Sequence, residues 1–134
     1  MKKLEAIIAP YMLDPVRESL LSRGVQGLSV SEVREGGDEP VRMNYYRGTA
    51  YEVALHPKLK LEIVVSDEDA MAIALAIVEA TRTARAGGSV TISAVEDAIR
   101  IRTGEHGPAA IDGRVNPSIE TQWLRTAHSR AYTA

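Results

Sequence analysis

The order of strand-like and helix-like patterns in the sequence predicts an α+β fold, in which a four-stranded antiparallel sheet carries two helices on one face. Branched-aliphatic stretches and helical stretches follow one another in the order βαββαβ, and split βαβ units of this order form the ferredoxin-like arrangement. The chain has 134 residues, which is enough for one hydrophobic core in one domain. It contains no cysteine, so this core forms without disulfides.

The first half of the chain supplies a strand, a helix and a second strand. Residues 4–10 are short and branched-aliphatic with a turn after them, which is typical of a buried strand. Asp14 and Pro15 provide an N-cap and a first-turn proline, and the helix that they begin runs to Gly24. Residues 25–33 alternate loosely between apolar and polar side chains and predict the second strand.

The second half begins with a strand and a helix. Residues 59–66 form the clearest strand of the sequence. Ser66 and Asp69 resemble a capping box for the long apolar helix that follows. The pair Gly87 and Gly88 ends this helix.

Two short strands complete the sheet and leave one of its faces uncovered. They are predicted at residues 90–95 and 98–102. Since both helices cover the same face, the other face stays open. We expect Ile7, Ile63 or Val65 to lie on this open face, which would then be too apolar for a monomer and would pack against copies of the same chain.

The segment "GGDEPVRMNYYRGTAY", residues 36–51, is long and polar and has no helical or strand period. Structureless loops longer than roughly 12–15 residues are usually functional or disordered. We therefore expect this loop to serve something other than the packing of the domain.

Charge and composition argue against several classes of function. The net charge is −2 with acidic and basic residues interspersed, and aromatic residues are few, which disfavours a nucleic-acid partner. No apolar run reaches membrane-spanning length, so we expect no membrane insertion and a cytoplasmic protein. His56, His106 and His128 lack the spacing of metal ligands, so no metal site is predicted. No catalytic set can be assembled from spacing, so no enzyme is predicted.

Four stretches together carry a specific resemblance. They are "MKKLEAIIAPYMLDPVRESLLSRGVQGLSVSEV", "YRGTAYEV", "PKLKLEIVVSD" and "AIRIRTGE". In this order, from Met1 to about Ile111, they resemble the PII signal-transduction family, the GlnB/GlnK-like proteins. The resemblance implies a homotrimer of ferredoxin-like subunits, an adenine nucleotide in each cleft between subunits, and a T-loop, about residues 36–54, that contacts a target protein. Residues 112–134 would form a C-terminal extension beyond a family domain of residues 1–111.

The resemblance also implies a set of nucleotide-binding residues. They are Ser29, Gly37, Glu62, Ile63, Val64, Arg85, Gly87, Gly88, Ser89, Arg100 and Arg102. Arg100 and Arg102 stand two apart on a predicted strand, so their guanidinium groups would leave the same face and form a fork for phosphate oxygens. Without the resemblance, the simpler interpretation is two solvated arginines on an edge strand. Glu62 would likewise be the polar member of an alternating strand.

The loop before the predicted strand at residues 90–95 departs from the family pattern. The family's B-loop is one residue longer and ends in a lysine that meets the outer phosphates, whereas "RAGGSVTI" has Ser89 there. A neutral hydroxyl thus replaces a cation. Affinity for a triphosphate should fall more than affinity for a di- or monophosphate, unless Arg85 compensates. We expect ADP or AMP to compete well with ATP.

The base of the T-loop departs from the family as well. Where typical members have a glutamine that helps hold magnesium with ATP and 2-oxoglutarate, this chain has Glu39 after Asp38. Glu39 still offers an oxygen to magnesium, but two acidic residues oppose a nearby anion. Lys58, the family's partner for a carboxylate of 2-oxoglutarate, is retained. The resemblance therefore implies a small-anion effector at Glu39 and Lys58, and we expect it to be 2-oxoglutarate, weakly bound, or bicarbonate, to which some carboxysome-associated relatives are thought to respond.

Four residues match the tip of the T-loop: Tyr46, Arg47, Gly48 and Tyr51. The resemblance implies that Tyr46, Arg47 and Tyr51 contact the partner. Tyr51 stands where many proteobacterial members accept a uridylyl group, so it is a candidate for modification. The alternative is that Tyr45, Tyr46 and Tyr51 are contact residues only, since tyrosine is enriched at interfaces.

The C-terminal extension has a pattern of its own. Asn116 and Pro117 predict the start of a short helix, and Ile119, Trp123 and Leu124 would share an apolar face. The extension would dock on the trimer, cover the nucleotide cleft or bind a partner. The alternative is a frayed tail.

The sequence therefore predicts a homotrimeric, non-enzymatic sensor of adenine nucleotide (ADP/AMP or ATP). Its T-loop would regulate a membrane transporter or a metabolic enzyme of nitrogen or inorganic-carbon metabolism. A carboxysome-associated sensor of bicarbonate is the nearest alternative. A nucleotide-hydrolysing enzyme and a structural trimer are the alternatives from other classes.

Overall fold

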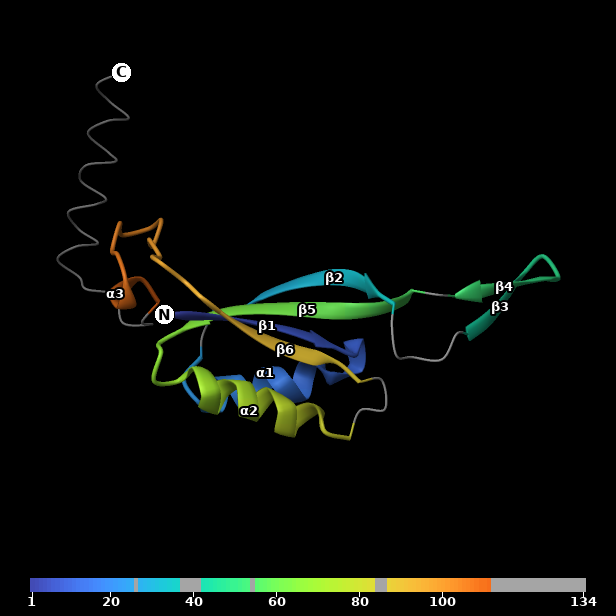
Figure 1. Cartoon of the computed structure of the whole chain (residues 1–134), viewed down its shortest axis with the longest axis horizontal. Helices are drawn as coiled ribbons and strands as arrows, with labels where there is room; N and C mark the ends of the chain where they lie inside the picture. Colours follow the sequence, from blue (N-terminus) through green and yellow to red (C-terminus); the bar gives the residue numbers. More distant parts are fainter. Residues whose placement is uncertain (26, 37–41, 54, 84–86, 112–134) are drawn as a thin grey trace, which may run out of the picture.

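A computed structural model describes residues 1–25, 27–36, 42–53, 55–83 and 87–111 of the chain. Most of these residues belong to strands or helices (Figure 1). The elements are β1 (Lys2–Ile8), the 3₁₀ helix η1 (Pro10–Met12), α1 (Leu13–Ser22), β2 (Ser29–Glu35), β3 (Arg42–Tyr46), β4 (Thr49–Val53), β5 (His56–Val65), α2 (Ala70–Thr81), β6 (Ser89–Ala94) and α3 (Pro108–Ile111).

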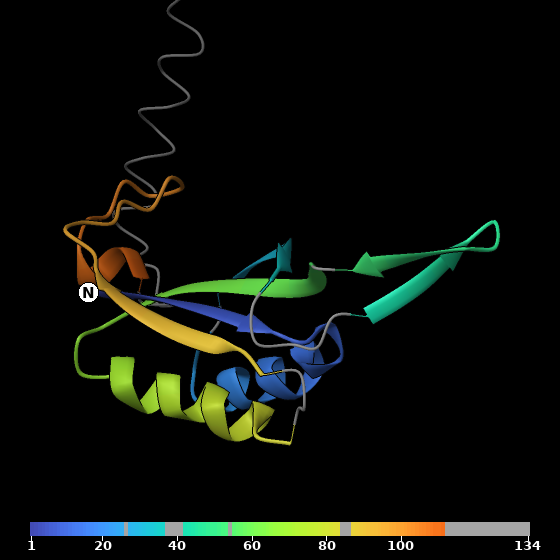
Figure 2. The ribbon, with the colours of Figure 1, turned by 45° about the vertical axis from the view of Figure 1, so that its right-hand side comes forward.

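The sheet has four strands in the order β2-β5-β1-β6, and all of its neighbouring pairs are antiparallel. Helices α1 and α2 lie side by side beneath one face of this sheet (Figures 1 and 2). The predicted α+β, ferredoxin-like architecture is therefore confirmed.

The hydrophobic core lies between this face and the two helices. Alternate residues of each central strand point into it, because side chains of a strand alternate between the two faces. The largest fully buried core side chains are Leu4 of β1, Leu61 of β5, Val16 and Leu20 of α1, and Ile77 of α2.

The opposite, open face is polar, and the prediction of an apolar open face was wrong. Ile63 and Val65 are only 2% and 6% exposed and belong to the core cluster. Their register explains this, because Ile63 lies opposite Leu4 of β1, which points to the helices. Ile7 is on the open face as expected, but it lies opposite Lys60.

The predicted element boundaries also need correction at the first helix and the last strand. Helix α1 begins at Leu13, after η1, so Asp14 lies inside the helix and is not its N-cap. Residues 98–102 do not form a strand. They belong to a turn that is held by one isolated bridge, between Ile99 and His106.

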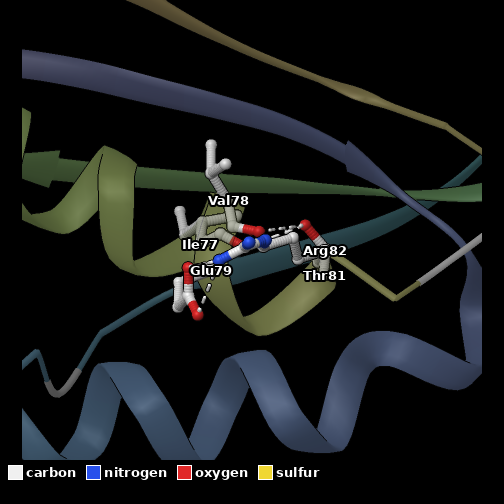
Figure 3. Close-up of polar contacts among 5 residues, drawn as sticks. All are labelled: Ile77, Val78, Glu79, Thr81 and Arg82. Atoms are coloured by element: carbon white, nitrogen blue, oxygen red, sulfur yellow. Dashed lines mark hydrogen bonds and ion pairs between the residues drawn. The ribbon is translucent and has the colours of Figure 1, made fainter.

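Helix α2 begins after its N-cap Asp69 and ends at Thr81, so Ser66 is not its N-cap and Gly87 and Gly88 do not end it, as had been predicted. The hydroxyl of Ser66 accepts a hydrogen bond of 3.3 Å from the Asp69 N–H in the turn before the helix. At the other end, the Thr81 hydroxyl donates to the Ile77 carbonyl at 2.9 Å (Figure 3). Arg82 pairs with Glu79 at 3.1 Å in the same view.

The segment predicted as a structureless loop contains a β-ribbon. Strands β3 and β4 pair in register and extend away from the main sheet (Figure 1). Arg47 and Gly48 form the two-residue turn with φ of 50° and 79°, as a type I′ hairpin requires. The prediction of a loop without strands was therefore wrong for residues 42–53. The signal that the sequence offered for a hairpin was the group of tyrosines on either side of the Arg47-Gly48 pair.

Gly88 tolerates no side chain at the start of β6. Its φ is +144°, and an added Cβ would collide with the backbone carbonyl oxygen of Ile7. We expect Gly88→Ala to lower the free energy of unfolding by about 2–4 kcal/mol. Gly27→Ala, whose Cβ would meet nothing within 4 Å, should change it by less than about 1 kcal/mol. Equal denaturation midpoints for the two variants would contradict this interpretation.

Candidate ligand-binding site

A cavity of about 830 Å³ opens where β1 begins and β5 ends. Its walls come from the sheet, from the connection between α1 and β2, from the start of α2 and from the segment that contains α3. The charged residues that line it are Lys3, Arg23, Glu62, Asp69 and Arg100. Three cations and two carboxylates give this described wall a small positive excess, which suits an anionic ligand.

The cavity brings together four of the residues predicted to bind nucleotide. They are Ser29, Glu62, Val64 and Arg100. Ser29 and Glu62 lie directly opposite each other on β2 and β5, so their side chains meet through the strand register alone. Ile63 does not line the cavity, because it points into the core on the other face of the sheet.

The predicted glycine-rich loop lies at the other end of the sheet. Ser89 pairs with Ile7 at the far end of β1, whereas Lys3, which lines the cavity, pairs with Ser93. Ser89 and Ala94 are the first and last residues of the six-residue strand β6, so they lie about 17 Å apart, and Arg100 follows beyond Ala94. The glycines and Arg100 of one chain therefore do not converge on one point.

Three other predicted site residues fall outside the described part of the chain. They are Gly37, Glu39 and Arg85. Lys58 lies within β5, opposite Val33 of β2, and is only 3% exposed. Its pairing with a small anion stays a prediction.

Two lysine–glutamate pairs order the open face beside the cavity. Glu5 and Glu62 lie directly opposite each other on β1 and β5, where two like charges destabilise a sheet. Lys3 Nζ lies 2.9 Å from the Glu5 carboxylate, and Lys60 Nζ lies 3.3 Å from that of Glu62. The Lys3 ammonium holds the pKa of Glu5 below its ordinary value, and Glu5 in turn raises the pKa of Lys3.

Arg100 is held in the cavity wall by its own turn. Its Nε donates to the Ala110 carbonyl at 3.2 Å, and its Nη1 lies 3.6 Å from Oε1 of Glu105. The Glu105 side chain is only 5% exposed. Backbone bonds from Arg100 N–H to the Glu105 carbonyl and from Gly104 N–H to the Arg100 carbonyl close this turn. The guanidinium plane is thereby fixed at two points.

The strand on which the two-arginine fork was predicted does not form. Residues 98–102 belong to a turn, so the period of a strand no longer places the two guanidinium groups on one face. Their joint contact with phosphate stays a prediction. Arg100 lines the cavity, whereas Arg102 is exposed and does not line it.

Comparisons with known proteins agree with this architecture. The family model "Nitrogen regulatory protein P-II" matches residues 1–105. This chain belongs to that family. Relatives of that name from Cereibacter sphaeroides, Rhodobacter capsulatus and Rhizobium meliloti are 52%, 48% and 47% identical over 112 residues. Each alignment covers 83% of this chain and 100% of the relative.

The tip of the ribbon in this P-II family chain is exposed. Tyr45 and Tyr46 are 75% and 65% exposed, and the Arg47 guanidinium carbon lies 5.4 Å from the centroid of the Tyr46 ring. Tyr51 lies in β4, opposite Asn44. Its modification, and the contact of these residues with a partner, stay predictions.

The described residues contain neither a candidate metal cluster nor a candidate membrane span. Among them, no group of three His, Cys, Asp or Glu residues could hold a metal ion. No helix within the same residues is long and apolar enough to cross a membrane.

Sequence reasoning missed a clasp that closes the turn around Arg100. Oδ1 of Asp97 accepts hydrogen bonds from the N–H groups of Ala98 at 2.8 Å and Gly107 at 3.1 Å. Its Oδ2 lies 3.3 Å from Nδ1 of His106. These contacts join residues up to ten apart in a segment without regular structure. Such a segment has no periodic pattern of side chains, so the sequence did not predict the contacts. Glu105 was missed for the same reason.

Removing the Asp97 charge should make the free energy of unfolding of this P-II family chain depend less on pH in the acidic range. His106, and then the two backbone N–H groups, hold the pKa of Asp97 below its ordinary value. The stabilisation is thus complete above the unfolded pKa, about 4, and is lost as the pH falls through the lower folded pKa. We expect Asp97→Asn to destabilise the protein at pH 7 and to lose less stability than wild type on acidification below about pH 4.

Urea unfolding at pH 7 and at several values below 4 measures this difference. Asp14→Asn, on the exposed side of α1, is the matched control, since none of the hydrogen bonds that form the clasp involves it. Parallel pH profiles for wild type and Asp97→Asn would show that the clasp contributes nothing.

Proposed function

We propose that this P-II family chain is a homotrimeric regulator that binds an adenine nucleotide in a cleft between subunits. One observation carries the proposal: the two groups expected to bind phosphate, Arg100 and the Gly87–Ser89 loop, lie at opposite ends of β6. The phosphates of one nucleotide are adjacent, so both groups reach them only if they come from different chains. A ring of copies, in which the open faces meet, supplies this arrangement.

Each half of such a cleft has a distinct task. The ribose and base would lie along β5, near Glu62 and Val64, where the strand offers backbone groups and an apolar side chain. Arg100, already fixed by Glu105 and Ala110, would meet the phosphates without further loss of side-chain freedom. A preorganised guanidinium is an effective phosphate ligand, since its donors match the oxygen spacing.

The nucleotide would be ADP or AMP at least as readily as ATP. Ser89 is the first residue of β6 and brings a neutral hydroxyl to the place where the family has a lysine. Magnesium with ATP, and 2-oxoglutarate or bicarbonate near Glu39 and Lys58, would provide the second signal. Lys58 is well shielded from water in the chain, which would strengthen its attraction for an anion.

The β3–β4 ribbon would transmit the state of the cleft to a target protein. The tip of the ribbon lies away from the sheet (Figure 2), and its turn contains Arg47 directly after Tyr46. The target would be a membrane transporter or a metabolic enzyme of nitrogen or inorganic-carbon metabolism. A ligand that prefers one ribbon arrangement shifts the population towards it, and target affinity changes by the same factor. No chemical step is required of the chain.

Arg100→Ala should weaken ADP binding by about tenfold or more, because a charged hydrogen bond to phosphate is lost. Titration calorimetry of wild type and variant measures the change. Arg82→Ala, at an arginine that follows α2 and whose side chain is 71% exposed, is the control and should bind as wild type does. Absence of nucleotide binding by wild type, or equal affinities for wild type and Arg100→Ala, would contradict the proposal.

Ser89→Lys should restore a preference for the triphosphate. An ammonium group at the start of β6 would add a charge-assisted contact to the outermost phosphate only, so the ratio of ATP to ADP affinity should rise about tenfold. Ser22→Lys adds the same charge at the end of α1 and should leave the ratio unchanged. A ratio that rises equally in both variants would reflect net charge, not the cleft.

A further inference from the structure

Helix α2 carries an apolar stripe on the side that faces away from the sheet. Residues 70–78 contain no polar side chain. Ile73, Ala74 and Ile77 point into the core, whereas Met71, Leu75 and Val78 are 61%, 58% and 48% exposed. These last three residues recur at i, i+4 and i+7 and therefore share one face of the helix. We call them the α2 stripe.

The neighbouring helix shows what a solvated outer face requires. Helix α1 packs beside α2 on the same side of the sheet (Figure 2), and its exposed positions include Asp14, Arg17 and Glu18. A helix that is apolar all round is normally buried, and contiguous exposed apolar side chains usually mark a contact surface. The α2 stripe therefore needs a covering partner, whereas α1 does not.

The C-terminal extension begins at the end of the domain where α2 starts. Ile111, the last described residue, lines the same cavity as Asp69 and Ile73 at the start of α2. Eight residues lead from Ile111 to Ile119, enough to span up to about 26 Å. The α2 stripe itself is only about 10 Å long, from Met71 to Val78. The extension is therefore long enough to lie along the whole stripe.

The composition of the extension complements the stripe. Ile119, Trp123 and Leu124 offer three large apolar side chains within six residues, and Arg125 and Arg130 follow them. The stripe lies between two exposed acidic residues, Glu68 before α2 and Glu79 in its last turn. We propose that residues 112–134 pack Ile119, Trp123 and Leu124 on the α2 stripe of their own chain. This inference is independent of nucleotide binding.

Trp123 is the only tryptophan of the chain, so its fluorescence reports directly on the contact. In the full-length wild-type protein we expect blue-shifted emission and weak quenching by acrylamide. Leu75→Glu places a charge in the middle of the stripe and should shift the emission to the red and raise the quenching constant severalfold. Leu75 is exposed, so the fold should survive, and circular dichroism checks this.

Leu55→Glu is the matched control. Leu55 is 49% exposed and directly precedes β5, at the end of the sheet near the ribbon (Figure 1). This variant makes the same chemical change at a similar exposure and should leave the emission of Trp123 as in wild type. Strong quenching already in wild type, or equal shifts in the two variants, would overturn the proposal.

A cysteine pair tests which chain supplies the extension. The chain has no cysteine of its own, so a link formed on oxidation of Leu75→Cys with Ile119→Cys is unambiguous. We expect a link within one chain, since a disulfide needs Cα atoms within about 7 Å. Leu55→Cys with Ile119→Cys should not link. A dimer band from the first pair would mean that a second copy covers the stripe, and no link at all would mean that the extension does not.

Discussion

The antiparallel register of β1 with β5 is the constraint on which the rest of the molecule depends. It places Leu4 beside Ile63 and Ala6 beside Leu61 on the helix side of the sheet. A slip of one residue would exchange these side chains for the charged ones of the other face, because the side-chain period of a strand is two. The burial of the core residues thus fixes the register, and the register fixes the open face.

The same register decides how the candidate site is divided. Lys3 and Val64 meet at one end of the central strand pair, where the cavity opens, and the backbone of Gly88 approaches Ile7 at the other end. A rigid sheet cannot bring its two ends together. In the proposed trimer the chain would therefore present two separate half-sites, and a complete cleft would follow from assembly and not from folding alone.

The irregular turn after β6 fixes the position of a side chain that the sheet does not hold. The turn after β6 has no regular period, and it is held by Asp97 at its base and by Glu105 against Arg100. Burying a charged pair costs solvation and contributes little net stability. Its value here lies in fixing a guanidinium at the wall of the cavity. Among the described residues, the β3–β4 ribbon, in contrast, makes few contacts with the main sheet.

The sequence by itself determined the order of the main elements, the strands of the core and the family, because period-two and helical patterns and turn residues are local properties. It also identified Ser29, Glu62, Val64 and Arg100, which the fold then gathered around one cavity. Only the tertiary structure decided which face Ile63 takes, since register is a contact between distant strands. The same holds for the turn at residues 98–102 and for the partners of Arg100, where contacts across the turn override a strand-like composition.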